Sequence, residues 1–393
     1  MERRPDKDSQ ESARVESLLT KRKFLKTCGK GLCALSLAQI LSLPGILRAQ
    51  TPQKGLVKTR ISPYFTALEG GTIQCELCPR RCLVPRGKRG FCGVRENREG
   101  KYYSLVYGNP CILFLDRIER EPFFHVLPGT SSLTLSTAGC NFRCKFCENW
   151  EISQAFPEDV YSQEFSPGLV VKKAKQMGAR SITYTYAEPT IFYEFMSDIA
   201  RHAKENGLLN VIHSNGFINP GPLRDLCKVI DAAHIDLKGF TPECYRELSE
   251  GEQGPVLETL KILRQENVHL EVSTLLIPTK NDEMSVIKDM AFWVNKELGV
   301  DTPVHLSRFY PLYKLKRLPP TPVSTLEKAR ETAISSGLKY VYIGRVPGHQ
   351  AWNTFCPNCH RPVIQRTGYM LEALHMTEGK CDNCGNPIPG IWG

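Results

Sequence analysis

Short apolar runs rich in Val, Ile, Leu and Tyr alternate with longer amphipathic segments from residue 133 onward. Such short runs, bounded by Gly, Pro, Asn and Asp, are typical of buried strands, and the longer segments are typical of helices with one buried face. The predicted strands are Leu133–Thr137, Ser181–Tyr186, Asn210–Ser214, Ala233–Leu237, Leu270–Ile277 and Val304–Phe309. The predicted crossover helices include Pro167–Met177, Thr190–Asn206 and Pro255–Glu266. This alternation predicts βα units around a parallel sheet.

Six βα units predict an α/β fold built on a partial (β/α)6 barrel of the TIM type, and Val341–Arg345 is a candidate further strand. Functional side chains of βα barrels gather at the C-terminal ends of the strands. Five residues suited to binding or catalysis directly follow a predicted strand: Cys140, Glu188, Asn215, Lys238 and Tyr310. The functional site is therefore expected at that edge of the sheet.

The pattern changes along the chain and predicts four parts. Residues 1–50 read as a targeting segment, and residues 51–125 form a cysteine-rich N-terminal module and a linker. Residues 126–348 form the barrel, and residues 349–393 form a small C-terminal module. A chain of 393 residues is long enough for one large domain with such additions.

The targeting segment has the three parts of an export signal. A basic run, Lys21–Lys26, precedes an uncharged stretch from Gly31 to Leu47 that is short for a membrane span, and Ala49 stands near a plausible cleavage site. Lys21-Arg22 resembles the pair of a twin-arginine signal, with Lys in place of the first Arg. Export to the periplasm is expected from this segment, whereas an uncleaved anchor or a signal that does not function are the alternatives. The sequence predicts no membrane span in the mature chain.

Charge and cysteine content narrow the range of possible functions. The net charge is +10, and the basic clusters are interpreted as solvated faces, so nucleic-acid binding is not favoured. Sixteen cysteines are present, and close-spaced cysteines in a chain of this length favour metal over disulfides. Eleven of them fall into three groups: Cys75, Cys78, Cys82 and Cys92; Cys140, Cys144 and Cys147; Cys356, Cys359, Cys381 and Cys384. The sequence thus predicts a metal-loaded protein assembled in a reducing compartment.

The central group carries the main chemistry. Cys140, Cys144 and Cys147 have three and two residues between them, so one tight loop can present three thiolates to three irons of a cubane. A [4Fe–4S] cluster needs four ligands, and the open iron can bind a substrate. A zinc loop or three unrelated buried cysteines are the alternatives.

The two four-cysteine groups suit other metals. Cys75, Cys78, Cys82 and Cys92 offer four soft ligands within eighteen residues, which suits zinc or an iron–sulfur centre, with zinc slightly favoured. The C-terminal group forms two CxxC pairs with twenty-one residues between them, the spacing of a zinc ribbon. Iron in a rubredoxin-like site is the alternative there.

The run CNFRCKFCENW, with Phe146 just before the last cysteine, resembles the radical S-adenosylmethionine (SAM) superfamily. Together with the four-cysteine knot and the Ala-Glu-Pro-Thr, Ser-Asn-Gly and Asp-Leu-Lys runs, residues 70–390 resemble the radical SAM enzymes of the AmmeMemoRadiSam system. That group is akin to pyruvate formate-lyase activating enzymes. The resemblance implies that Cys140, Cys144 and Cys147 bind a [4Fe–4S] cluster. It also implies that further residues line the SAM site: Phe146, Ala187, Glu188, Asn215, Asp236 and Lys238. From their places after predicted strands, Ser214 is a candidate to reach the ribose hydroxyls, and Arg308 and Tyr310 are candidates to contact SAM or the substrate.

The Ala-Glu-Pro-Thr and Ser-Asn-Gly runs follow predicted strands and carry groups that can bind SAM. Glu188 can accept a hydrogen bond from the SAM ammonium group, although it also suits the start of a helix before Pro189. Relatives often have Gly-Gly-Glu-Pro where this chain has Tyr186-Ala187-Glu188-Pro189, so the backbone approach is expected to differ. Gly216 permits a left-handed turn after Asn215.

The predicted function is an oxidoreductase that reductively cleaves SAM and abstracts a hydrogen atom, as activases do on a protein partner. Ferredoxin or flavodoxin is the expected electron donor. A small-molecule substrate is the main alternative for an enzyme. A non-enzymatic electron carrier, or a zinc-ribbon module that binds nucleic acid, is the alternative of another class. Free SAM and a strong reductant are expected in the cytoplasm, in conflict with the export signal.

Overall fold

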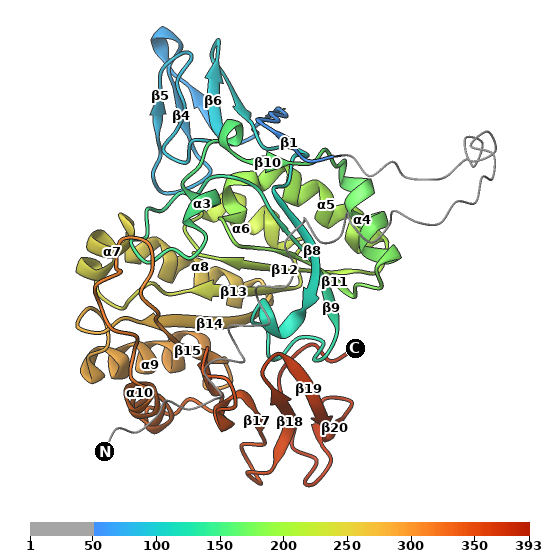
Figure 1. Cartoon of the computed structure of the whole chain (residues 1–393), viewed down its shortest axis with the longest axis vertical. Helices are drawn as coiled ribbons and strands as arrows, with labels where there is room; N and C mark the ends of the chain where they lie inside the picture. Colours follow the sequence, from blue (N-terminus) through green and yellow to red (C-terminus); the bar gives the residue numbers. More distant parts are fainter. Residues whose placement is uncertain (1–50) are drawn as a thin grey trace, which may run out of the picture. The chain divides into compact units, whose positions relative to one another are not determined.

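The computed structural model describes residues 51–393, and the targeting segment predicted for residues 1–50 lies outside the described residues. Its centre is an eight-stranded sheet in the order β16-β15-β14-β13-β12-β11-β9-β8 (Figure 1). The strands are β8 Ile112–Arg117, β9 Ser131–Ser136, β11 Ser181–Tyr184, β12 Leu209–Ser214, β13 Ala232–Asp236, β14 His269–Leu276, β15 Val304–Arg308 and β16 Val341–Gly344. Neighbouring strands from β9 to β16 pair in parallel, whereas β8 pairs with β9 in the antiparallel direction.

Six predicted strands agree with the structure to within two residues at each end, and the candidate strand at residues 341–345 is β16. The sheet therefore holds seven parallel strands where the sequence predicts six units. The two ends of the order, β8 and β16, do not pair with each other. The α/β class is confirmed, and closure into a partial barrel stays a prediction.

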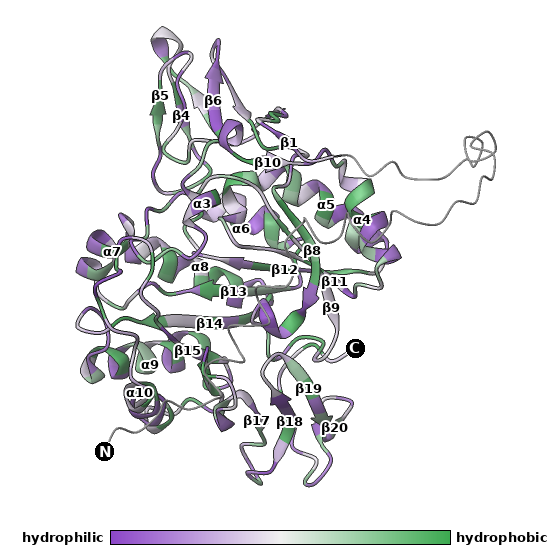
Figure 2. Cartoon of the chain, viewed as in Figure 1, coloured by the Kyte–Doolittle hydropathy of each residue, from purple (hydrophilic) through white to green (hydrophobic). Residues whose placement is uncertain are grey.

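Helices connect the parallel strands. The predicted ones are α4 Pro167–Gln176, α5 Tyr193–Glu205, which follows a 3-10 turn at Pro189–Phe192, and α8 Gln253–Gln265. The others are α3 Trp150–Ser153, α6 Pro220–Cys227, α7 Pro242–Ser249, α9 Met284–Leu298 and α10 Val323–Ser335. Figure 2 shows hydrophobic and hydrophilic residues along the same ribbon in α4, α5 and α9, as expected of helices with one buried face. Ile199, Leu260 and Val294 are fully buried.

Smaller sheets form the flanking parts. In the N-terminal part, β3 Phe65–Ala67, β4 Ile73–Cys75 and β5 Leu83–Val84 form one sheet, and β2 Arg60–Ile61, β7 Lys101–Ser104 and β6 Arg95–Arg98 form another. Two short strands, β1 Gln53–Lys54 and β10 Tyr161–Ser162, pair beside them. In the C-terminal part, β17 Thr354–Phe355, β18 Pro362–Thr367 and β19 Met370–Leu374 form a sheet beside the hairpin β20 Met376–Thr377 and β21 Lys380–Cys381.

The C-terminal part packs on the main sheet through its own apolar cluster. Trp352, Cys356 and Ile364 are buried together with Phe124 and Tyr342, and Tyr342 lies on β16. The domain boundaries predicted from the sequence stay predictions, although β8 joins the main sheet from the segment predicted as a linker. Within residues 51–393 we find no helix with the length and hydrophobicity that crossing a bilayer requires.

Candidate active site at the strand ends

The three cysteines of the central group follow β9 on one loop, as predicted. Cys144 is buried, and Cys140 and Cys147 are half-buried. The backbone N–H of Cys147 donates to the carbonyl of Cys144 at 3.2 Å, which gives the loop a tight turn. Two further backbone bonds, from Arg143 to Ser249 (2.9 Å) and from Lys145 to Leu248 (2.8 Å), attach the loop to the end of α7.

Each of the three sulfur atoms has a polar neighbour. The backbone N–H of Phe142 donates to the Cys140 sulfur at 3.3 Å, Cys144 lies 3.3 Å from the Ser249 hydroxyl, and Cys147 lies 3.2 Å from the Ser153 hydroxyl. Burial raises the pKa of the Cys144 thiol to about 11, and nearby Lys238 opposes this shift. Donors and a cation of this kind stabilise thiolates, the form that binds metal.

Asp236 and Lys238 form a half-buried ion pair at the end of β13. The Lys238 ammonium donates to Asp236 at 2.6 Å, and its nitrogen lies 5.9 Å from the ring centre of Phe146. Asp236 also accepts from Ser273 and lies 2.9 Å from Nε2 of His213. Burial tends to raise the pKa of Asp236, but Lys238 and His213 outweigh burial and hold that pKa well below its usual range. Asp236 is therefore a fixed negative charge beside the cysteine loop.

Glu188 joins the ends of β11 and β12. Its Oε1 accepts from the backbone N–H and the hydroxyl of Thr190 (3.0 and 2.8 Å) and from the Ser214 hydroxyl (2.7 Å). Its Oε2 accepts from the backbone N–H of Asn215 at 2.9 Å. The carboxylate thus caps the 3-10 turn that begins at Pro189, and Oε2 retains capacity for another donor.

Asn215 connects this carboxylate to the cysteine loop. Its side-chain amide donates to Asn141 at 2.8 Å and lies 3.9 Å from the Cys140 sulfur. The next residue, Gly216, has a φ of 70°, so the predicted left-handed turn is confirmed. The structure therefore brings Glu188, Asn215 and Cys140 together.

Arg308 and Tyr310 lie at the end of β15 and contact each other. Arg308 donates to the backbone carbonyl of Thr321 at 2.8 Å and to the Tyr310 hydroxyl at 3.3 Å. Tyr310 donates to the carbonyl of Arg345, whose side chain pairs with Glu148, the residue after Cys147. This pair reaches the cysteine loop through Arg345. Its contact with SAM stays a prediction.

Beneath the strand ends lies a buried polar layer that sequence reasoning missed. His234, Glu271 and His305 place ligand-type atoms within 4.8 Å of one another, and all three are buried. Glu271 accepts from the backbone N–H of Phe124 and lies 2.7 Å from Nε2 of His305. A signal was present, because polar residues recur at every second position of strands that otherwise read as apolar.

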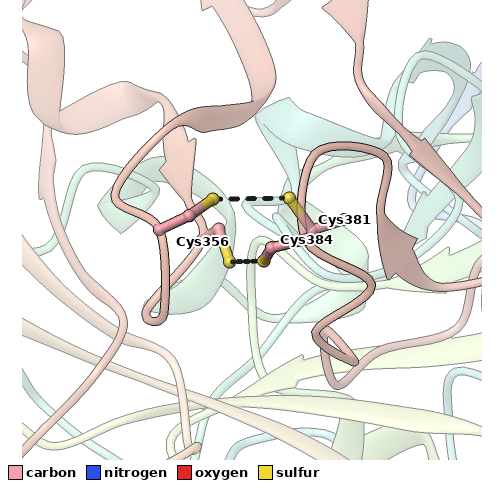
Figure 3. A group of neighbouring side chains, drawn as sticks. Cys356, Cys381 and Cys384 are labelled. Carbon is pink, nitrogen blue, oxygen red and sulfur yellow. Dashed lines mark hydrogen bonds between the residues drawn. The ribbon is translucent and has the colours of Figure 1, made fainter.

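The two four-cysteine groups differ in geometry. In the C-terminal group all four sulfurs lie within 4.8 Å of one another, which is close enough to share one metal ion (Figure 3). The Cys356 and Cys384 sulfurs are 3.5 Å apart, and those of Cys359 and Cys381 are 3.7 Å apart. The N-terminal group instead lines one common cavity.

Comparison with known proteins identifies the superfamily. The sequence profile of the radical SAM superfamily matches residues 134–290, from β9 into α9. An uncharacterized protein of Methanocaldococcus jannaschii is 43% identical over 333 residues, which cover 84% of this chain and 98% of the relative. The chain belongs to the radical SAM superfamily, whose members use a [4Fe–4S] cluster and SAM.

Two relatives of named activity are more distant. A GTP 3′,8-cyclase of Limosilactobacillus fermentum is 27% identical over 268 residues, which cover 62% of this chain and 78% of the relative. A pyruvate formate-lyase-activating enzyme of Listeria monocytogenes is 26% identical over 156 residues, which cover 37% of this chain and 62% of the relative. The predicted kinship with activating enzymes is confirmed at this level of identity.

Proposed function

We propose that the chain is a SAM-cleaving radical enzyme of the activase type, which abstracts a hydrogen atom from a protein partner. The observation that carries the proposal is the convergence of the cysteine loop, Glu188, Asn215 and the Asp236–Lys238 pair at one edge of the sheet. The three thiol groups, each with a polar neighbour, suit a cubane with one open iron. When bound, that cluster supplies the electron that cleaves SAM into methionine and a 5′-deoxyadenosyl radical.

The chain's own side chains bind and orient SAM. The free capacity of Glu188 Oε2 suits the SAM ammonium group, and Ser214 and Thr190 hold that carboxylate in place. Asp236 is kept ionised by Lys238 and His213, so it suits a ribose hydroxyl or the sulfonium charge. Phe146 and Ala187 complete the lining beside them, and Arg308 and Tyr310 close the site from β15.

We propose zinc for the C-terminal group. A zinc ion with Zn–S bonds of about 2.3 Å separates its sulfurs by about 3.8 Å. The two measured separations, 3.5 and 3.7 Å, are close to that value. Since Cys356 and Cys381 belong to the buried cluster of the C-terminal part, the metal would stabilise that part.

Anaerobic reconstitution with iron and sulfide, followed by SAM and dithionite, tests the reaction. Mass spectrometry is expected to detect 5′-deoxyadenosine from the native chain and from Cys227→Ala, a half-buried cysteine outside the three groups. Cys144→Ala is expected to form none. A cluster-loaded native protein that forms no 5′-deoxyadenosine contradicts the proposal.

The substrate class is tested with cell extract of the source organism. A protein substrate predicts that the macromolecular fraction stimulates 5′-deoxyadenosine formation, and that protease treatment removes the stimulation. The likeness to a GTP 3′,8-cyclase over 62% of the chain favours a small-molecule substrate as the second candidate. In that case the low-molecular-weight filtrate stimulates instead.

A further inference from the structure

The N-terminal cysteines face one cavity. Cys75, Cys78, Cys82 and Cys92 all line it, and Cys75 and Cys78 are buried. The thiols come from the end of β4, from the turn between β4 and β5, and from the loop before β6. Four soft ligands around one cavity predict a bound metal centre.

The separation of the sulfurs distinguishes one metal ion from a cluster. Among residues 51–393, the groups whose ligand atoms all lie within 4.8 Å of one another include the C-terminal cysteines but not the N-terminal ones. One zinc ion requires sulfurs about 3.8 Å apart. A cubane attaches each sulfur to a different iron, so its ligands stand farther apart. The central cysteines, on which the superfamily assembles its cluster, are likewise outside the 4.8 Å groups.

The charges around the cavity suit an anionic cluster. Four thiolates carry four negative charges, and two guanidinium groups, those of Arg80 and Arg95, line the same space. Arg95 is 1% exposed and is held by Glu194 through two hydrogen bonds of 2.8 and 2.6 Å. Arg80 is half-buried, and the two arginines offset part of the cost of burying thiolates.

The cavity lies beside the strand-end site. Asn141, which follows Cys140, and Thr190, which holds Glu188, both line it. The Arg80 guanidinium donates to the backbone carbonyl of Asn141 at 2.5 Å. The two cysteine sites are therefore in contact through one arginine and one asparagine.

We propose that Cys75, Cys78, Cys82 and Cys92 hold a second [4Fe–4S] cluster, in place of the zinc favoured from the sequence, and that it passes electrons to the centre at the strand ends. A ferredoxin or flavodoxin gives one electron to this second cluster, which is then oxidised as the strand-end centre is reduced. No bond forms and no proton moves in this step. The relay rests on the proposed function, whereas the presence of the second cluster does not.

Metal analysis and low-temperature electron paramagnetic resonance of three proteins test the cluster. The proteins are the native chain, the triple variant Cys140→Ala/Cys144→Ala/Cys147→Ala, and the double variant Cys78→Ala/Cys92→Ala, with Cys227→Ala as the matched control. The native chain and the control are expected to hold about eight irons, and the triple variant about four, with a reducible paramagnetic centre. The double variant is expected to lose about half of the iron.

Two results overturn the cluster. One is a native chain with about four irons and two zinc ions, and the other is a triple variant without iron. If the strand-end cysteines on which the proposed function depends hold no cluster, iron is lost in the double variant and kept in full by the triple variant. For the relay, the spectrum of the fully reduced native chain is expected to be broadened relative to the sum of the two variants' spectra. A spectrum equal to that sum overturns the relay.

Discussion

Replacing Glu188 with glutamine exchanges one oxygen of a buried carboxylate for an NH2 group. The shape of the side chain stays the same. Three donors converge on Oε1, namely the Thr190 N–H, the Thr190 hydroxyl and the Ser214 hydroxyl. The amide oxygen of glutamine is therefore expected to stay at that position. The amide nitrogen must then face the backbone N–H of Asn215, which now donates to Oε2 at 2.9 Å.

The cost follows from this mismatch. A glutamine nitrogen cannot accept a hydrogen bond, so the buried N–H of Asn215 loses its acceptor. An unsatisfied buried donor costs about 1–3 kcal/mol, and we expect Glu188→Gln to lower the free energy of unfolding by about 2 kcal/mol. Thr190→Val removes a single donor and leaves the acceptor intact, so we expect about 1 kcal/mol for this control.

Urea unfolding of the native chain and the two variants, at one pH and the same metal content, measures these changes. Titration calorimetry with SAM measures the second effect of the substitution, because the amide removes the acceptor capacity assigned to the ammonium group. The expected loss of SAM affinity in Glu188→Gln is about tenfold or more, with Thr190→Val close to native. A change below about 0.5 kcal/mol for Glu188→Gln would refute the assigned hydrogen-bond pattern.

Three further predictions concern stability. Arg95→Met leaves Glu194 buried without its partner and is expected to cost about 3–5 kcal/mol in urea unfolding; a loss below about 1 kcal/mol contradicts the buried pair. Burial lowers the pKa of His125 to about 4. The neutral imidazole is therefore favoured in the folded chain, and stability is expected to fall by about 3 kcal/mol as the pH drops from about 6.5 to 4. The free energy of unfolding of His125→Phe is expected to lack this part of the pH dependence. If the native chain and the variant lose stability in parallel between these pH values, the assignment to His125 is contradicted. Treating the full chain with a strong chelator is expected to remove the zinc proposed for the C-terminal group and to open residues 353–393 to limited proteolysis, as in Cys384→Ser. The main sheet is expected to stay intact, and unchanged resistance argues against a structural metal.

Local pattern is sufficient where residues that favour a strand follow a turn residue. The strand over residues 181–184 is fully buried, contains the β-branched residues Ile182 and Thr183 and follows Gly178, so the sequence predicts its start correctly. The helices α6 and α7 have eight residues each and a proline in the first turn, and such short amphipathic segments resemble loops in sequence. The direction of β8 was not predicted, because no local pattern distinguishes an antiparallel edge strand from a parallel one.

The site shows the same division between local and long-range information. Cysteine spacing and strand ends identify Cys140 and Glu188, because both signals lie within a few residues. The contact between Arg80 and Asn141 spans 61 residues, and the pair of Arg95 with Glu194 spans 99 residues. Such contacts depend on how separate elements pack, so one sequence does not reveal them.

The antiparallel strand β8 also explains why the chain tolerates tyrosine where relatives often have glycine. Tyr186 has a φ of 63°, a left-handed conformation that costs a non-glycine residue about 1 kcal/mol or more. Its ring lies 5.9 Å from that of Phe114 on β8, and its carbonyl accepts from Asn149 at 2.8 Å. Both contacts offset the strain, and the turn directs the N–H of Ala187 to the Ser136 hydroxyl at 3.1 Å. Phe114 on β8 thus supplies the packing partner for Tyr186. Because of this contact, the backbone before Glu188 keeps a left-handed turn of the kind that glycine adopts freely, with tyrosine in place of glycine.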